Sequence, residues 1–314
     1  MPELPEVTTT VNGLQRVLPG STITDIWTDL NKKNQSIKQF KRTIKDDVFF
    51  KYFKKIIIGQ KILNVERRAK NILIQLENKD TILIHLKMTG HLLFGEYIKK
   101  QVKNEKVKNK IFWESKYDGP LRDPYNRFVH VLFTLRDKKN NVKHLAFCDA
   151  RKFGKVTLLS ADTLFETVGP EPLDPDFSFE RFSARLSRKP SGKIKTVLMD
   201  QTVVAGVGNI YSDEALWLAG VHPESIVKKI PKPEMKKIFT AMKRVLLTGI
   251  DFGGDSTSDY RDIDGNRGRF HHKHNVYQKK GEPCGKKGCS DVILRKVING
   301  RSAHFCPTHQ HLYS

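Results

Sequence analysis

The sequence predicts an α+β protein of more than one domain, with an antiparallel β part first, helices second and a small cysteine-containing unit last. Short β-branched or alternating runs fill residues 22–159, and helical periodicities follow from residue 179 onward. Three of the four cysteines lie in the last 31 residues. A chain of 314 residues is long enough to give such domains proper hydrophobic cores.

The first domain is expected to be an antiparallel β-sandwich with flanking helices over residues 2–160. Apolar residues at helical spacing predict a first helix over residues 6–18, namely Val7, Val11, Leu14 and Leu18. The predicted strands are residues 62–65, 72–76, 81–88, 128–135, 144–148 and 155–159. Polar turn clusters separate consecutive runs and indicate hairpins of a sandwich or barrel. Residues 96–127 interrupt this pattern, and their lysine-rich, polar composition predicts a long loop.

A proline-dense stretch marks the end of the β part. Residues 168–175 sustain neither regular element, so we place an interdomain linker at residues 161–177. Helices are then predicted at residues 179–186, 194–199, 210–219 and 233–247. We assign residues 178–268 to a helical domain and residues 269–314 to a third unit, which is too poor in apolar residues to fold on its own core.

The charge balance points to a polyanionic partner. Lysine and arginine number 56 against 34 acidic residues, giving a net charge of +22 and a pI near 9.8. Double-stranded DNA fits this excess, because cationic side chains that neutralise phosphates release counterions. The longest apolar runs are far shorter than the roughly 20 residues of a membrane helix. We expect a monomer in the cytoplasm, associated with the nucleoid, and no membrane partner.

Pro2 and Glu3 are the first candidate catalytic residues. Removing Met1 makes Pro2 an amino-terminal secondary amine, and an α-amino group titrates at about 7.7–8.0, so a useful fraction is unprotonated near neutral pH. Attack by such an amine on a sugar carbon gives a cationic iminium, which acts as an electron sink for elimination. Glu3 would supply the acid. The plain alternative is that proline at position two merely permits removal of the initiator methionine.

The carboxy-terminal cysteines form a candidate metal site. Cys284-x4-Cys289 is followed after sixteen residues by Cys306-x2-His309, the pattern of two ligand pairs on two knuckles joined by a hairpin. Tetrahedral Zn²⁺ accepts three thiolates and one imidazole, and it would replace the missing core. His304 and His311 compete with His309 for the fourth position. Cys148 stands alone in an apolar strand and is expected to be a buried thiol.

Three further segments have residues suited to phosphate or base contacts. Residues 206–211 open a helix with backbone amides that no side chain covers, an arrangement that accepts a phosphate. Residues 67–70 and 149–154 combine cations with turns that face a groove. Arg151 and Phe153 stand two apart, so a ring can wedge between bases while a guanidinium fills a vacated space.

Taken together, these segments resemble the bacterial formamidopyrimidine-DNA glycosylase family. The matching segments, in chain order, are Pro2-Glu3-Leu4-Pro5-Glu6, Arg67-Arg68-Ala69-Lys70, His85-Leu86-Lys87-Met88-Thr89-Gly90, Asp149-Ala150-Arg151-Lys152-Phe153-Gly154, Gly169-Pro170-Glu171-Pro172-Leu173, Met199-Asp200-Gln201, residues 206–211, Val276-Tyr277 and Gly281-Glu282-Pro283-Cys284. The resemblance implies a helix-two-turn-helix bundle in the second domain and a zinc-finger β-hairpin in the third. It also implies a bifunctional enzyme that excises oxidised purines, chiefly 8-oxoguanine and formamidopyrimidines, and then cuts the strand by β,δ-elimination.

The resemblance also implies a role for individual residues. Those in catalysis are Pro2 as nucleophile, Glu3 as acid, Lys70 in proton transfer and Arg301 in the second elimination. Those in DNA binding are Met88, Arg127, Arg151, Lys152, Phe153, Lys195, Asn209 and Tyr260. The metal ligands are Cys284, Cys289, Cys306 and His309, holding one structural Zn²⁺. Residues 253–268 resemble a mobile loop that closes over the flipped base.

The chain departs from the family pattern at three places. His309 stands where a fourth cysteine is usual, and the first knuckle is Cys-x4-Cys where Cys-x2-Cys is usual. Lys152 replaces an arginine, which exchanges a bidentate fork for a point charge, and Phe128 replaces a histidine. Two alternatives remain open: an endonuclease VIII-like enzyme for oxidised pyrimidines, against which Leu4 argues, and a non-catalytic binder of damaged DNA.

Overall fold

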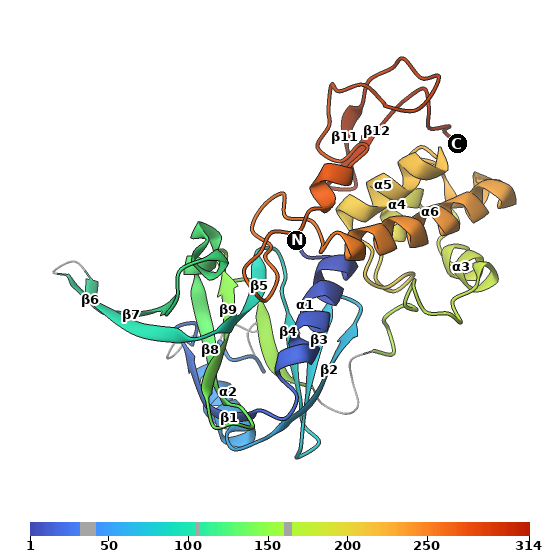
Figure 1. Cartoon of the computed structure of the whole chain (residues 1–314). Coiled ribbons are helices and arrows are strands. Elements are labelled where there is room, and N and C mark those ends of the chain that lie inside the picture. The colour runs from blue at the N-terminus through green and yellow to red at the C-terminus, as the bar shows by residue number, and fades with distance from the viewer. Residues whose placement is uncertain (32–41, 105–106, 160–164) are drawn as a thin grey trace. The chain divides into compact units, whose positions relative to one another are not determined.

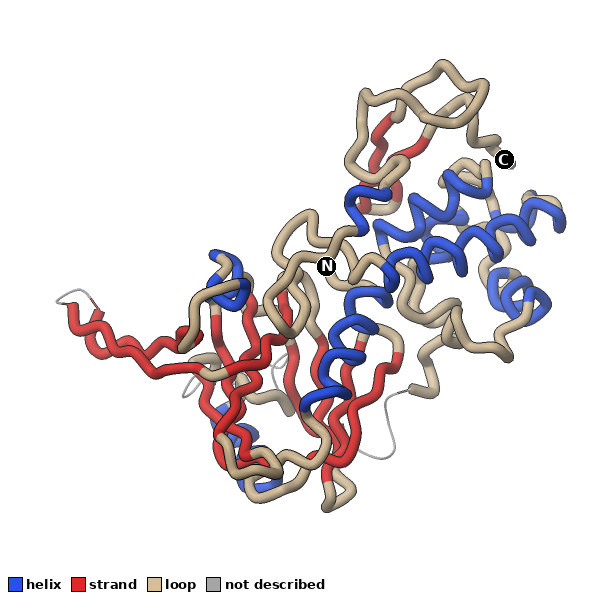
Figure 2. Tube along the Cα trace, viewed as in Figure 1, coloured by secondary structure: helices blue, strands red, loops and turns tan. Residues whose placement is uncertain are grey.

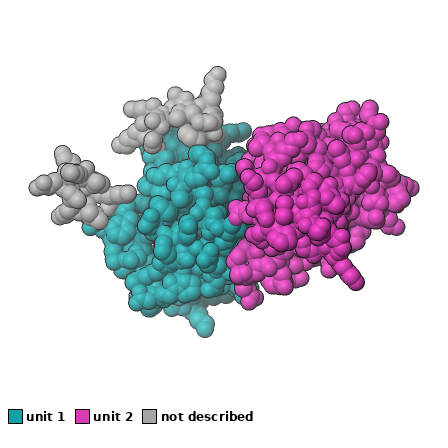
Figure 3. Space-filling view, turned by 90° about the horizontal axis from the view of Figure 1, so that it is seen from above, with its two compact units in different colours: residues 1–2, 6–164, 253–268 teal, residues 3–5, 165–252, 269–314 magenta. Residues whose placement is uncertain are grey.

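The chain forms two compact units (Figure 3). The computed structural model describes residues 1–31, 42–104, 107–159 and 165–314. Unit 1 comprises Met1–Pro2, Glu6–Leu164 and Gly253–Gly268, and unit 2 comprises Glu3–Pro5, Phe165–Phe252 and Arg269–Ser314. Unit 1 is mainly strand and unit 2 mainly helix (Figure 2). The predicted α+β class is therefore confirmed.

Unit 1 contains two four-stranded antiparallel sheets, with strand orders β1-β8-β9-β5 and β10-β4-β3-β2 (Figure 1). Their strands are β1 (Thr22–Thr28), β2 (Ile62–Arg68), β3 (Asn71–Leu76), β4 (Thr81–His85), β5 (Gly90–Gly95), β8 (Val129–Arg136), β9 (Val142–Asp149) and β10 (Lys155–Leu159). Alternating residues of both sheets enter one hydrophobic core, so the sheets form a sandwich. Every strand that the sequence predicts is present.

Two helices add to the core of unit 1. Helix α1 (Leu4–Val17) buries Val7, Val11 and Leu14, as its periodicity predicts. Helix α2 (Asp47–Ile57) was not predicted. It begins at Asp46, whose carboxylate accepts hydrogen bonds from two amides of the first turn, and it buries Phe53 and Ile57.

The prediction of a long loop over residues 96–127 is wrong for most of that segment. It forms a two-stranded ribbon of β6 (Tyr97–Asn104) and β7 (Val107–Ser115), followed by the short 3-10 helices η2 (Pro120–Arg122) and η3 (Pro124–Arg127). In the ribbon Lys99 lies opposite Trp113 and Lys100 opposite Phe112. The aromatic member of each pair lies on β7 and the lysine on β6. Because β6 is rich in lysine, its sequence does not show the alternation of apolar and polar residues that predicts a strand.

Unit 2 is built on four helices around a second core. They are α3 (Phe179–Leu186), α4 (Ile194–Leu198), α5 (Asn209–Ala219) and α6 (Lys232–Asp251). Gly220 ends α5 in the left-handed region at φ 73°. The described part of the expected linker, residues 165–177, has neither helix nor strand. Among the described residues, no helix is both long and apolar enough to cross a membrane.

The third expected unit, residues 269–314, is compact with the helices of unit 2. It holds η5 (Phe270–Lys273) and a hairpin of β11 (Leu294–Ile298) and β12 (Arg301–Phe305). Residues 253–268, which the sequence analysis placed with the helices, are instead compact with the β-sandwich of unit 1. The buried side chains of Ile263 and Arg261 hold these residues in unit 1. The sequence does not show which residues these two side chains contact, so this placement could not be predicted.

Candidate functional site

The carboxylate of Glu3 lies at the start of helix α5. This helix has no side-chain cap of its own, and its first turn receives Glu3 instead, whose Oε1 accepts a hydrogen bond from Ile210 N at 3.0 Å. Leu4 N donates to Gly206 O at 3.0 Å and fixes the chain beside it. A Cβ on Gly208 would lie 2.3 Å from Glu3 Cδ, so only glycine leaves room for the carboxylate there.

The expectation that residues 206–211 offer uncovered amides to a phosphate is wrong for two of them. Ile210 N is bonded to Glu3, and Gly206 N donates to Gln201 Oε1 at 2.8 Å. Asn209, half-buried, donates from Nδ2 to Ser302 Oγ at 3.3 Å. Ser302 follows the exposed Arg301 at the start of β12, so Asn209 and Arg301, both predicted site residues, lie in one region of unit 2.

Pro2 is buried while Met1 is attached, and Met1 itself is 39% exposed. Because Met1 is exposed, an aminopeptidase can reach it, and removal of Met1 would make the Pro2 nitrogen a free secondary amine. The boundary between the two units falls between these residues, with Pro2 in unit 1 and Glu3 in unit 2.

Lys70 lies in a group of lysines at one end of the sheet β10-β4-β3-β2. It occupies the two-residue turn between β2 and β3 and is 6% exposed. The pKa of the neighbouring His85 is lowered to about 3, first by burial and then by the positive charges of Lys87, Lys70 and Lys155. The imidazole is therefore neutral at physiological pH. This concentration of positive charge suits an anionic ligand.

Met88, Arg151 and Phe153 come from two adjacent loops of unit 1. The loop from β4 to β5 carries Met88, and the loop from β9 to β10 carries the other two. The buried carboxylate of Asp149 joins the loops, because it accepts from Thr89 Oγ1 and, at 2.6 Å, from Gly154 N. Phe153 is 52% exposed.

The two side chains of the second loop are stacked on one another. Arg151 Cζ lies 4.6 Å from the centre of the Phe153 ring. A ring and a guanidinium stacked at an exposed loop tip are the residue types that the wedge prediction requires.

Arg127 and Lys152 are also exposed in unit 1. The Arg127 guanidinium stacks on Phe128, with 4.8 Å between Cζ and the ring centre. Lys152 adopts a left-handed φ of 57° in the loop, and its carbonyl accepts from Lys45 Nζ at 2.7 Å. Both side chains reach solvent, and Lys152 Nζ lies 3.8 Å from Asp29 Oδ2.

Two other predicted DNA contacts, Lys195 and Tyr260, are buried. Lys195 Nζ is bonded to Asp213 and, at 2.9 Å, to Ser302 O. The Tyr260 hydroxyl donates to Glu6 O at 3.0 Å, and burial raises the pKa of this phenol. Their polar atoms are hydrogen-bonded to protein groups, and both side chains are buried.

Asp213 and Glu214 are two buried acids next to the predicted site residues, and the sequence analysis missed them. Both are 1% exposed on α5. Asp213 Oδ2 accepts from His304 N at 3.0 Å, and Glu214 Oε1 accepts from the amides of Val276 and Tyr277 at 3.0 and 2.9 Å. Two consecutive acids in an otherwise apolar helix were the available signal, since buried carboxylates require partners.

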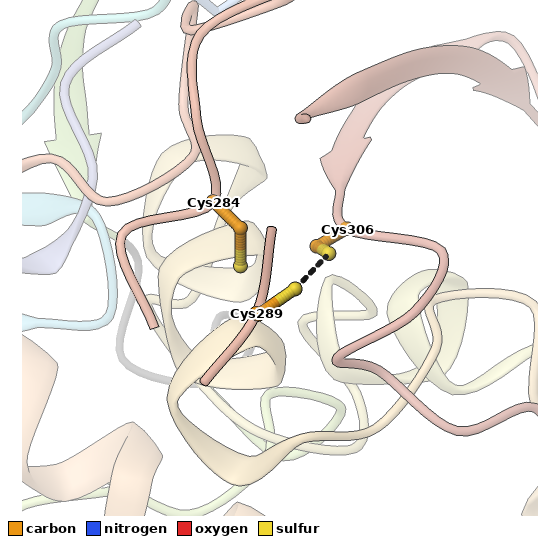
Figure 4. A group of neighbouring side chains, drawn as sticks. All are labelled: Cys284, Cys289 and Cys306. Atoms are coloured by element: carbon orange, nitrogen blue, oxygen red, sulfur yellow. Dashed lines mark hydrogen bonds between the residues drawn. The ribbon is translucent and has the colours of Figure 1, made fainter. Parts of the chain in front are cut away.

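Three cysteines converge in the carboxy-terminal part of unit 2 (Figure 4). The sulphur atoms of Cys284, Cys289 and Cys306 lie within 4.8 Å of one another, and Cys289 Sγ is 3.6 Å from Cys306 Sγ. Zn–S bonds of about 2.3 Å in a tetrahedron separate sulphur atoms by about 3.8 Å, so this group fits a metal ion.

No histidine joins this group among the described residues. His309 Nε2 lies 2.8 Å from Trp217 O, while His309 N donates to Cys306 Sγ at 3.3 Å. Of the competing histidines, His304 is engaged by Asp213 through Nδ1 at 3.1 Å, and His311 packs its ring against Tyr313.

Family models match both halves of the chain. The model described as the formamidopyrimidine-DNA glycosylase N-terminal domain matches residues 1–156, and that described as the formamidopyrimidine-DNA glycosylase H2TH domain matches residues 168–261. The fold and the two matches define the class of protein: a DNA glycosylase of base-excision repair with a helix-two-turn-helix domain.

Individual relatives agree with this class over the full length. The formamidopyrimidine-DNA glycosylase of Herpetosiphon aurantiacus is 36% identical over 313 residues, with 99% of this chain and all of the relative covered. That of Pelotomaculum thermopropionicum is 35% identical, with 99% of each chain covered. The chain belongs to the formamidopyrimidine-DNA glycosylase family, whose members are glycosylases and AP lyases.

Solved structures are similar as well. The Lactococcus lactis Fpg in complex with DNA containing an abasic site is 29% identical, with a TM-score of 0.78, covering 98% of this chain and 99% of that one. The MutM (Fpg) protein of Thermus thermophilus has a TM-score of 0.75 at 29% identity, with 98% of each chain covered. The predicted family, fold and enzyme class are thus confirmed.

Proposed function

We propose that this chain excises oxidised purines, chiefly 8-oxoguanine and formamidopyrimidines, from duplex DNA and then cleaves the strand by β,δ-elimination. Pro2, exposed by removal of Met1, is the nucleophile. The placement of the Glu3 carboxylate, held at the start of α5 by Ile210 N, supports this assignment most directly. An acid fixed in the residue next to a secondary amine is the pair that imine chemistry at a sugar requires.

The proposed reaction proceeds through an iminium. The Pro2 nitrogen forms a bond to C1′ as the bond from C1′ to the base breaks, and Glu3 donates a proton that opens the sugar ring. The cationic iminium acidifies the C2′ proton, so β-elimination and then δ-elimination expel the two phosphates. We assign Lys70 to proton transfer and Arg301 to the second elimination.

The DNA contacts are assigned to exposed and half-buried residues of the two units. Met88, Arg151 and Phe153 fill the space that the flipped nucleotide leaves. Phosphates are assigned to Arg127, Lys152 and Asn209. Lys195 and Tyr260 contribute through the hairpin and the loop that they hold. The net charge of +22 fits association with the nucleoid.

Zn²⁺ is the metal proposed for the cysteine group, with His309 as fourth ligand. If His309 Nε2 donates its hydrogen to Trp217 O, Nδ1 carries the lone pair that a metal takes up. When bound, the ion supplies structural bracing of the carboxy-terminal hairpin and no step of the reaction. Three thiolates and this imidazole would supply the four ligands that a structural Zn²⁺ takes.

Borohydride trapping tests the proposal. We expect a covalent complex between the wild-type protein and DNA containing 8-oxoguanine, and much less of it with Pro2→Gly, while duplex binding persists. Mass spectrometry of the purified protein should show that Met1 is absent. Equal trapping by the variant would contradict the assignment of the nucleophile. A cleavage panel with preference for oxidised pyrimidines would contradict the substrate class.

A further inference from the structure

Residues Gly253–Gly268, here called the 253–268 loop, lie between two elements of unit 2 but are fastened within unit 1. The base of the loop is tied to the first turn of α1, because Asp255 N donates to Glu6 Oε1 at 2.7 Å. The two sides of the loop are joined to each other by Gly268 N, which donates to Ser256 Oγ at 2.8 Å. Its entry and exit are therefore held together.

The middle of the loop is held by an ion pair between a buried arginine and a partly exposed aspartate. Arg261 is 1% exposed, and its Nη2 lies 3.0 Å from both carboxylate oxygens of Asp123. Arg261 Nη1 donates to the loop's own carbonyls at Ser258 and Tyr260. The guanidinium also lies over the Tyr125 ring, 4.8 Å from its centre. One side chain thus shapes the loop and attaches it to the segment between η2 and η3.

Two further contacts fix the tip. Ile263 is buried in the core of unit 1, and its carbonyl accepts from Phe94 N at 2.7 Å. Gly265 has a φ of 88°, and a Cβ there would lie 2.6 Å from the carbonyl group of Pro120. The loop and the segment around η2 and η3 therefore approach each other so closely at Gly265 that a larger residue would force them apart.

The loop lies close to the proposed nucleophile. Glu6, which holds the base of the loop, follows Pro2 by four residues, so at most about 14 Å of extended chain separates them. Both residues belong to unit 1. A base released from the sugar that Pro2 attacks is therefore within reach of the loop.

We propose that Asp123 and Arg261 are positioning residues that set the 253–268 loop in its base-receiving conformation before DNA binds. This inference rests on the proposed function. A preformed loop avoids the entropic cost of ordering its backbone when the damaged base arrives. It also gives a role to the segment after the β6–β7 ribbon, which supplies Asp123. Excision needs the loop, whereas cleavage at an abasic site, which has no base to hold, does not.

The test compares Asp123→Asn with Asp118→Asn, a matched change on the same segment. Asp118 pairs with Arg122 but is 90% exposed, so it controls for the loss of one carboxylate. We expect Asp123→Asn to lower single-turnover excision of 8-oxoguanine at least tenfold and to leave cleavage of preformed abasic-site DNA within twofold of wild type. Hydrogen exchange of the loop amides in the free protein should rise. Asp118→Asn should change none of these.

A second variant guards against misfolding. Arg261→Lys keeps the charge and loses the bidentate pairing, so we expect a smaller effect in the same direction. Unchanged hydrogen exchange of the loop in both variants, or an equal loss of excision and abasic-site cleavage, overturns the inference. Failure of the proposed function has a different signature, because the wild-type protein itself would then not be trapped on DNA.

Discussion

Gly208→Ala tests whether the position of the Glu3 carboxylate matters for catalysis. A Cβ at residue 208 would lie 2.3 Å from Glu3 Cδ and 2.5 Å from Glu3 Oε1. Carbon atoms in contact stand about 3.5–4.0 Å apart, so the carboxylate must move by more than about 1 Å. The clash involves the end of a flexible side chain, and Gly208 has an ordinary extended backbone. The protein should therefore fold.

The hydrogen bond from Ile210 N sets the size of the effect. A hydrogen bond to a charged group contributes about 1.5–3 kcal/mol. If this free energy holds the acid in place, its loss lowers the excision rate by roughly 10- to 150-fold, at 1.36 kcal/mol for each factor of ten. A displacement of about 1 Å at a reacting group gives a loss of the same order.

The assay is single-turnover excision of 8-oxoguanine, with duplex affinity measured beside it. Gly95→Ala is the matched control, because its Cβ would meet only the end of the Leu121 side chain and one distant ring atom of Tyr97. We expect the control to excise normally and both variants to bind duplex DNA like wild type. Excision by Gly208→Ala within twofold of the wild-type rate would refute the reasoning.

Two other predictions concern unit 2. A chelator should release about one Zn²⁺ per chain, measured with a colorimetric dye, and Cys289→Ser should lower the amount of bound metal. Either change should weaken duplex binding, because metal ligation replaces the hydrophobic core that this part of the chain lacks. Unchanged duplex binding after full release of the metal would contradict this. Lys195 and Asp213 form an ion pair whose side chains are 1% and 0% exposed. Lys195→Met leaves the buried Asp213 carboxylate without its cationic partner, so the free energy of unfolding, measured with urea, should fall by about 3–5 kcal/mol. The double change with Asp213→Leu should recover most of it.

Local periodicity was sufficient for most of the fold. The spacing of Val7, Val11 and Leu14 predicted α1, and the short alternating runs predicted six of the eight strands of the two sheets, all but β1 and β5. Helix α2 was missed because Phe49, Phe50 and Phe53 are residue types that favour strands. Its helical character depends on the cap at Asp46 and on burial of one face in the core.

The candidate site could be predicted only where residue type and spacing were enough. Paired spacing in the sequence found the three cysteines. The cap that Glu3 provides could not be found, because 207 positions separate it from Ile210. The same holds for Asp123 and Arg261, which are 138 positions apart. Such pairs exist only in the folded chain, and the residues beside each member in the sequence do not indicate its partner.

The buried acids of α5 bear on how freely the end of the chain can vary. Asp213 and Glu214 accept hydrogen bonds from main-chain amides at His304, Val276 and Tyr277. Any amino acid except proline offers such an amide. Substitutions of these three residues other than to proline therefore keep the donors in place. A change to either acid removes one of several attachments, because main-chain hydrogen bonds also join His311 to Gly220 and Tyr313 to Ile226.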